Sequence, residues 1–139
     1  MAAQDQHPIN SGFGFKTTAR DIVGHTDLTG RNYIVTGGGS GIGLETVRAL
    51  ARVGGHVTVP VRDRGKAEAA LADVAGQVVI ADMDLADIAS VRRFAADYAA
   101  NGKPLHGLIN NAGFMACPLA RVGKAWEYQF AVCISAISR

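Results

Sequence analysis

A glycine-rich segment is the part of this 139-residue sequence best suited to chemistry. Residues 36–43 (TGGGSGIG) follow a β-branched stretch and precede a helical pattern. Glycines let a backbone approach a pyrophosphate closely, and the first turn of a helix offers unpaired N–H groups and a favourable dipole. The segment therefore predicts a phosphate-binding turn, with Ser40 adding a hydroxyl for the ribose or a phosphate. The alternative is a plain loop whose glycines only allow close packing of the helix on the sheet.

Two charged residues, Arg62 and Asp63, follow the next β-branched stretch, about twenty residues beyond the turn. NAD sites usually present a carboxylate to the ribose 2′-hydroxyl at this point. A guanidinium can instead bind a 2′-phosphate through two hydrogen bonds, and a carboxylate would repel that group. Arg62 therefore favours NADP, with NAD as the alternative if Asp63 turns towards the ribose. The structural alternatives are a solvated loop charge for Arg62 and a helix N-cap for Asp63.

The elements that must position these residues alternate between strands and helices from residue 32 onward, which is typical of βαβ units and a parallel sheet. We expect strands over residues 33–36, 56–61, 78–81 and 105–110, and helices over 41–52, 66–75 and from about 87 to a stop at Gly102 and Pro104. Because crossovers between parallel strands are right-handed, these units predict an α/β fold with an incomplete, Rossmann-type doubly wound sheet of about four strands. Residues 1–30 are expected to form a surface arm, and 31–139 the domain.

Apolar spacing assigns an inward face to two of these helices. The helix that begins near Asp87 shows the clearest stripe, and the helix over 66–75 shows a weaker one. The predicted inward residues of the first are Ile88, Val91, Phe94, Ala95 and Tyr98, and those of the second are Ala67, Ala70, Leu71 and Val74.

Three motifs in the expected order then resemble one family. TGGGSGIG is similar to the TGxxxGIG fingerprint of short-chain dehydrogenases/reductases, Asp84 and Leu85 to the family's acidic-Leu pair near the adenine, and residues 110–113 (NNAG) to its NNAG motif. Residues 84–92 look most like the retinol dehydrogenase-like members. The resemblance extends from about Leu28 to Phe130.

The resemblance implies an oxidoreductase that transfers hydride between NAD or NADP and a small carbonyl or alcohol substrate, and Arg62 adds the preference for NADP. It implies these cofactor-binding residues: Gly37, Ser40, Gly41, Ile42, Gly43, Arg62, Asp84, Leu85, Asn111, Ala112 and Gly113. The alternative function is a non-catalytic dinucleotide-binding or regulatory module. A methyltransferase with a similar sheet is disfavoured by Thr36 and by the NNAG motif.

The catalytic Ser, Tyr and Lys that the resemblance implies have no counterpart in the sequence. The fourth residue after Tyr33, Tyr98 and Tyr128 is never Lys, although a phenol with an ordinary pKa near 10 needs such a neighbour to exchange protons efficiently. Residues 129–132 resemble the family's QFxVN segment, but Cys133 stands where that pattern has a catalytic Asn, and residues 134–139 depart from the family. We therefore expect an inactive fragment truncated by a frameshift, an early stop codon or an incomplete gene model.

Composition excludes several other functions. The 14 basic and 12 acidic residues are interspersed, which argues against nucleic acid. Cys117, Cys133 and the four histidines lack metal-ligand spacing, so no metal is expected. No secretory signal pattern and no window of about 18 apolar residues occurs, so we expect a cytoplasmic protein without a membrane span. The strand over 105–110 would be an open edge beside apolar surface, which predicts self-association.

Overall fold

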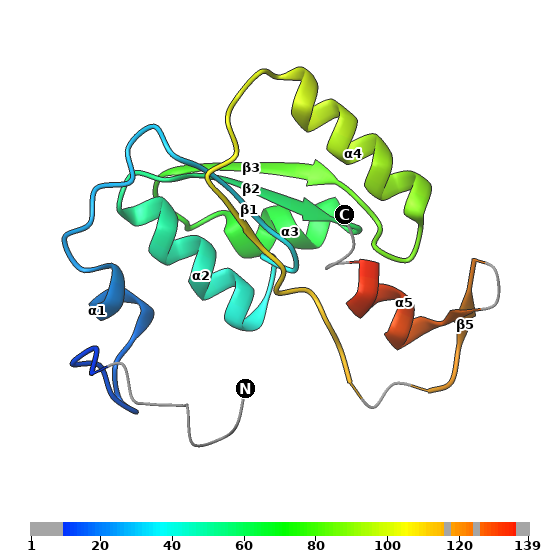
Figure 1. Cartoon of the computed structure of the whole chain (residues 1–139), viewed down its shortest axis with the longest axis horizontal. Helices are drawn as coiled ribbons and strands as arrows, with labels where there is room; N and C mark the ends of the chain where they lie inside the picture. The colour runs from blue at the N-terminus through cyan, green and yellow to red at the C-terminus, as the bar shows by residue number, and fades with distance from the viewer. Residues whose placement is uncertain (1–9, 116–117, 124–125, 136–139) are drawn as a thin grey trace.

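The computed structural model describes residues 10–115, 118–123 and 126–135, and a four-stranded parallel sheet lies at its centre (Figure 1). The strand order is β3-β2-β1-β4. The strands are β1 (Asn32–Val35), β2 (His56–Val61), β3 (Gln77–Asp82) and β4 (Gly107–Ile109). The predicted α/β, Rossmann-type parallel sheet is thus confirmed, with β4 at one edge of the sheet.

One face of the sheet carries the core. Helices α2 (Gly41–Arg52) and α3 (Arg64–Leu71) pack on it and enclose the valine side chains of β1 and β2. Strands covered by helices favour β-branched residues, which fit well on a pleated, buried surface. The fully buried core includes Val35, Val47, Val57 and Val59.

Helix α3 begins two residues before its predicted start and ends four residues before its predicted end. It begins early because the Asp63 side chain caps it, accepting a hydrogen bond from the Lys66 N–H at 3.1 Å. Beyond Leu71 the chain forms a turn in which the Val74 N–H donates to the Leu71 carbonyl at 3.0 Å. Val74 still packs against the core, so its apolar spacing indicated burial rather than helix.

Helix α4 (Ile88–Ala100) lies over the other face of the sheet (Figure 1), and none of its residues is fully buried. The Asp87 side chain caps α4 by accepting from the Ala89 N–H at 2.9 Å. Ala95, predicted to face inward, is exposed, because α4 approaches the sheet with the larger side chains of its stripe. On the same face Val79 and Leu108 are 61% and 53% exposed.

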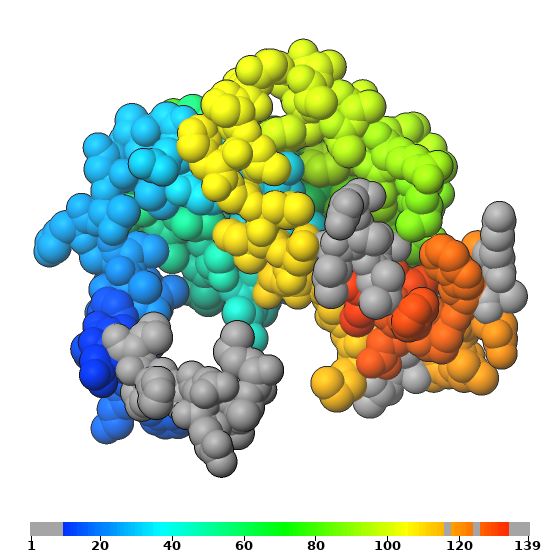
Figure 2. Space-filling view, viewed as in Figure 1, coloured from blue at the N-terminus to red at the C-terminus, as the bar shows by residue number. Residues whose placement is uncertain are grey.

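Two segments adopt structure that the sequence analysis did not predict. In the arm, α1 (Ala19–Val23) lies beside α2 and starts with a capping box in which Thr18 and Asp21 exchange hydrogen bonds. Near the C-terminus, β5 (Arg121–Val122) and β6 (Trp126–Glu127) form an antiparallel pair that leads into α5 (Tyr128–Ser135). Figure 2 shows this C-terminal unit, in orange and red, gathered at one side of the molecule below α4. No helix in the described part of the chain combines the length and apolarity needed to cross a membrane.

Candidate functional site

The glycine turn joins β1 to α2 at the carboxyl end of the sheet. A Cβ on Gly43 would lie only 2.3 Å from the Gly37 carbonyl oxygen and 2.4 Å from Asn111 Nδ2, so only glycine fits there. Gly41 has a φ of +51°, and a Cβ on it would meet nothing within 4 Å. The turn is therefore tightly packed on its inner side and open on its outer side, as a cradle for a ligand must be.

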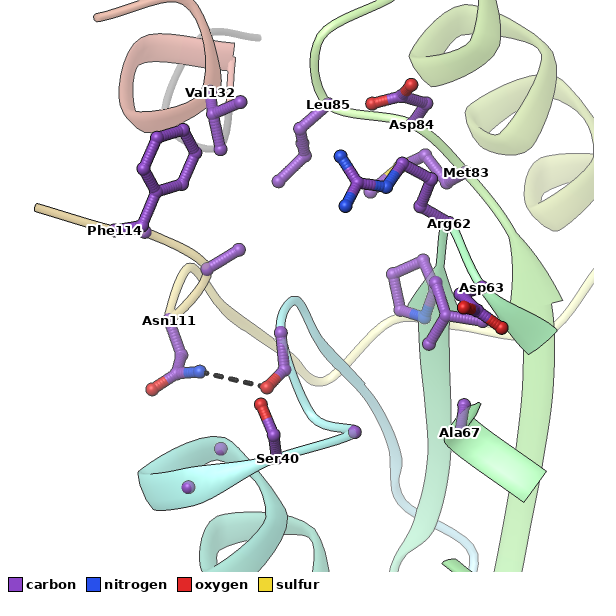
Figure 3. A pocket seen from close by; sticks show the side chains of 18 of the residues that line it. Ser40, Arg62, Asp63, Ala67, Met83, Asp84, Leu85, Asn111, Phe114 and Val132 are labelled. Carbon is purple, nitrogen blue, oxygen red and sulfur yellow. Dashed lines mark hydrogen bonds between the residues drawn. The ribbon is translucent and has the colours of Figure 1, made fainter. Parts of the chain in front are cut away.

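Hydrogen bonds tie the turn to the loop after β4. The hydroxyl of buried Thr36 accepts from the Asn111 N–H at 3.1 Å and the Ala112 N–H at 3.0 Å. Asn111 Nδ2 donates to the Thr36 carbonyl at 3.0 Å and to the Gly37 carbonyl at 3.4 Å, and Figure 3 draws a hydrogen bond from Asn111 to the glycine turn. Asn111 therefore positions the turn rather than offering its amide N–H groups to a ligand.

A cavity of about 580 Å³ opens above the turn, between the carboxyl ends of the strands and the N-terminus of α2. All the cofactor-binding residues predicted from the sequence line it: Gly37, Ser40, Gly41, Ile42, Gly43, Arg62, Asp84, Leu85, Asn111, Ala112 and Gly113. Ser40 is the N-cap residue of α2, yet its hydroxyl makes no cap hydrogen bond. That hydroxyl and the first-turn N–H groups remain available to an anion.

Arg62 and Asp63 differ in what their side chains do. Asp63 caps α3, and its carboxylate also lies 3.5 Å from Lys66 Nζ. The hydrogen bond from the Lys66 N–H lowers the pKa of Asp63 below its usual 3.8, with the Lys66 charge acting in the same direction. Arg62 extends into the cavity in Figure 3, so a guanidinium reaches the ligand space while the neighbouring carboxylate is engaged by the helix.

The loop after β3 supplies one wall. The Asp84 N–H donates to Ser90 Oγ at 3.0 Å, and an Asp84 carboxylate oxygen accepts from the Ala86 N–H at 2.9 Å. These contacts hold the loop in shape and leave Leu85 to project into the cavity (Figure 3). Asp84 thus stabilises the loop through its hydrogen bonds, and the Leu85 side chain offers an apolar surface on which an aromatic ring of a ligand can pack.

Several lining residues were not predicted from the sequence. Lys66, in the first turn of α3, brings a second cation to the cavity that Arg62 lines. Phe114, Tyr128 and Val132 come from the NNAG loop and α5. The Tyr128 hydroxyl accepts a hydrogen bond from Arg62 Nη1, and its ring lies 4.9 Å from that of Phe114. No local pattern signals contacts between segments so far apart in sequence.

The sequence itself matches a known family across the whole sheet. The family described as "short chain dehydrogenase" matches residues 31–137. The chain belongs to this family. Its oxidoreductase relatives include retinol dehydrogenase 12 of Bos taurus, 41% identical over 110 residues, which cover 76% of this chain and 35% of the relative. A short-chain dehydrogenase/reductase named prx1, from Penicillium roqueforti, is 38% identical over 123 residues, covering 84% of this chain and 36% of the relative.

Solved structures superpose on the described fold. An uncharacterized protein from Mycobacterium paratuberculosis has a TM-score of 0.73 at 41% identity, with 84% of this chain and 41% of that chain covered. A metagenomic short-chain oxidoreductase in complex with NADP has a TM-score of 0.59 at 30% identity, with 63% and 41% covered. This short-chain dehydrogenase sequence spans about a third of the length of the curated relatives it matches.

The cavity fits the NAD(P) that the family binds. The turn is open where a pyrophosphate would lie, Leu85 provides an apolar surface, and Arg62 adds positive charge at the rim. The described residues contain no group of three His, Cys, Asp or Glu side chains that could hold a metal ion.

Proposed function

We propose that this chain is the cofactor-binding part of an NADP-preferring short-chain oxidoreductase. One observation carries the preference: Arg62 and Asp63 both line the cavity, but the Asp63 carboxylate caps α3 and the Arg62 guanidinium does not serve the helix. In an NAD site a carboxylate would face the ribose, and here that carboxylate accepts a hydrogen bond from the Lys66 N–H of α3. The guanidinium is left to bind a 2′-phosphate.

Each group in the cavity has a defined role in this proposal. The N–H groups of the glycine turn and the dipole of α2 hold the pyrophosphate, and the Ser40 hydroxyl donates to a phosphate or ribose oxygen. Leu85 packs against the adenine. When bound, the cofactor supplies or accepts the hydride, and the protein fixes its orientation.

Lys66 is a second candidate for the 2′-phosphate. It lines the cavity, its side chain is 87% exposed, and among the described residues only the 3.5 Å contact with Asp63 engages its ammonium group. Such an exposed pair is weak, so Lys66 can turn to a phosphate at little cost. Two cations would then face a group that carries about two negative charges.

The whole family member would transfer hydride between the cofactor and a small carbonyl or alcohol. The 139 residues contain no Tyr with a Lys four positions later, and Cys133 occupies the place of the family's catalytic Asn. We therefore expect these residues to bind cofactor without turnover.

The edge of the sheet at β4 supports self-association, because Leu105 and Leu108 are 45% and 53% exposed there. A monodisperse monomer in sizing experiments would contradict self-association.

Titration with NADPH and NADH, followed by cofactor fluorescence, tests the proposal. We expect saturable binding that favours NADPH, and about a 10- to 100-fold loss of NADPH affinity in Arg62→Ala, because a charged hydrogen-bonding partner of the phosphate is removed. Arg92→Ala changes an exposed arginine of α4 outside the cavity and should bind like the parent chain. Equal affinity for both cofactors, or an unaffected Arg62→Ala variant, would contradict the NADP preference.

A further inference from the structure

Tyr128 meets Arg62 across the rim of the cavity. The two residues are 66 positions apart in sequence, and both line the cavity. Tyr128 begins α5, whereas Arg62 directly follows β2. Their hydrogen bond therefore links the C-terminal segment to the group that would read the 2′-phosphate.

The acceptor in this contact is neutral. A guanidinium has five N–H donors in a fixed plane, and a phosphate or carboxylate can take two of them in parallel. The Tyr128 hydroxyl accepts from Nη1 alone. A 2′-phosphate is the stronger acceptor, but it must first displace the phenol from that nitrogen.

Other contacts hold the Tyr128 ring in place. The rings of Tyr128 and Phe114 lie 4.9 Å apart at 49°, and Val132, one helical turn further along α5, is buried. The Glu127 carboxylate caps α5 by accepting from the N–H groups of Gln129 and Phe130 at 2.9 and 2.7 Å. Removing only the hydroxyl should therefore release Arg62 without moving α5 far.

We propose that Tyr128 is a specificity-determining residue that lowers the preference for the phosphorylated cofactor by occupying Arg62. This inference rests on the proposed dinucleotide function and adds to it a control of cofactor choice. Binding of a 2′-phosphate requires Arg62 to leave the phenol, whereas a 2′-hydroxyl makes no such demand. The contact therefore opposes NADPH more than NADH.

The test compares Tyr128→Phe with the parent chain in NADPH and NADH titrations. We expect NADPH to bind about three- to tenfold more tightly in the variant, within the range of one ordinary intramolecular hydrogen bond, with NADH nearly unchanged. Tyr98→Phe removes a hydroxyl outside the cavity and should change neither affinity. Unchanged or weaker NADPH binding in Tyr128→Phe would overturn the inference, the latter because Tyr128 would then be orienting Arg62 for the phosphate.

A double-mutant cycle identifies the group through which Tyr128 acts. In an Arg62→Ala background, Tyr128→Phe should leave NADPH affinity unchanged, because the competing contact no longer exists. An undiminished effect of Tyr128→Phe in that background would overturn the role of Arg62.

Hydrogen exchange without ligand separates failure of this inference from failure of the proposed function. The guanidinium N–H groups of Arg62, followed by NMR, should exchange several-fold faster in Tyr128→Phe, and unchanged rates would refute the contact with the phenol. If neither chain binds any dinucleotide, the proposed function fails, and the role of Tyr128 in cofactor choice fails with it.

Discussion

Helices α2 and α4 pack on opposite faces of the same sheet and differ sharply in how they do so. Helix α2 has 12 residues and buries four of them: Gly43, Val47, Ala49 and Ala51. Helix α4 has 13 residues and buries none. The face that carries α2 also carries the glycine turn, so the candidate site is built on the well-packed side of the molecule.

The difference arises from residue size at the helix–sheet contact. Small residues let α2 approach the strands closely, and its valine fills the space between them. Helix α4 meets the sheet with Phe94 and Tyr98, and a cavity of about 480 Å³ remains between α4 and the strands. An apolar stripe at helical spacing thus shows which side of a helix faces the protein but not how close it lies.

The largest effect on the free energy of unfolding is expected at Gly43, where α2 and the glycine turn approach each other most closely. Gly43→Ala places a methyl group against the Gly37 carbonyl and the Asn111 amide. Because the Gly37 carbonyl belongs to the backbone, rotating a side chain cannot relieve this clash. We expect a loss at the upper end of the roughly 1–3 kcal/mol that overpacking costs, measured by chemical unfolding. Gly39→Ala is the matched control, because its nearest neighbour would lie 3.6 Å away. Equal stability of the two variants would contradict the packing of the turn.

Two valines, one on each face of the sheet, allow the packing under α2 and under α4 to be compared directly. Val59 is 0% exposed on the α2 side, and Val79 is 61% exposed on the α4 side. Val59→Ala should cost roughly 2–3 kcal/mol of unfolding free energy, and Val79→Ala no more than about 0.5 kcal/mol. Similar losses in denaturant titrations would show that α4 covers its face as closely as α2 does.

Tyr98 provides a smaller test on the α4 side. Its hydroxyl is buried without a hydrogen-bond partner in the part of the chain that the structure describes, and this burial raises the pKa of the phenol. Tyr98→Phe removes the unsatisfied group and should stabilise the protein by about 1 kcal/mol. A fall in thermal stability would mean that the hydroxyl has a partner, and that α4 packs more tightly than described.

The smallest effect is the pH dependence of the α3 cap. Its hydrogen bond lowers the pKa of Asp63 below 3.8, so the cap contributes its full stability above that value and loses it as the pH falls through the lowered pKa. Thermal unfolding of Asp63→Asn, which keeps an acceptor but cannot titrate, should depend slightly less on pH between about pH 5 and pH 3. A steeper dependence would have the wrong sign for a capping carboxylate.

The sequence predicts the site better than it predicts the surroundings of the site. The glycine turn and the bounds of α2 and β2 were predictable because strand, turn and helix signals coincide there within a few residues. The early start of α3 depends on one side-chain cap, and the Arg62–Tyr128 contact joins segments 66 residues apart. Such contacts follow from tertiary packing, for which this sequence carries no local signal.

The central claim is that the cavity above the glycine turn binds a dinucleotide. The most direct test of this claim is hydrogen exchange of the chain with and without NADPH. The claim predicts that the amides of residues 39–43, 61–63 and 111–114 become protected together, because they line one cavity although they are far apart in sequence. The outer face of α4 should exchange as before. Protection confined to α4, or no protection in the turn at saturating NADPH, would contradict the claim.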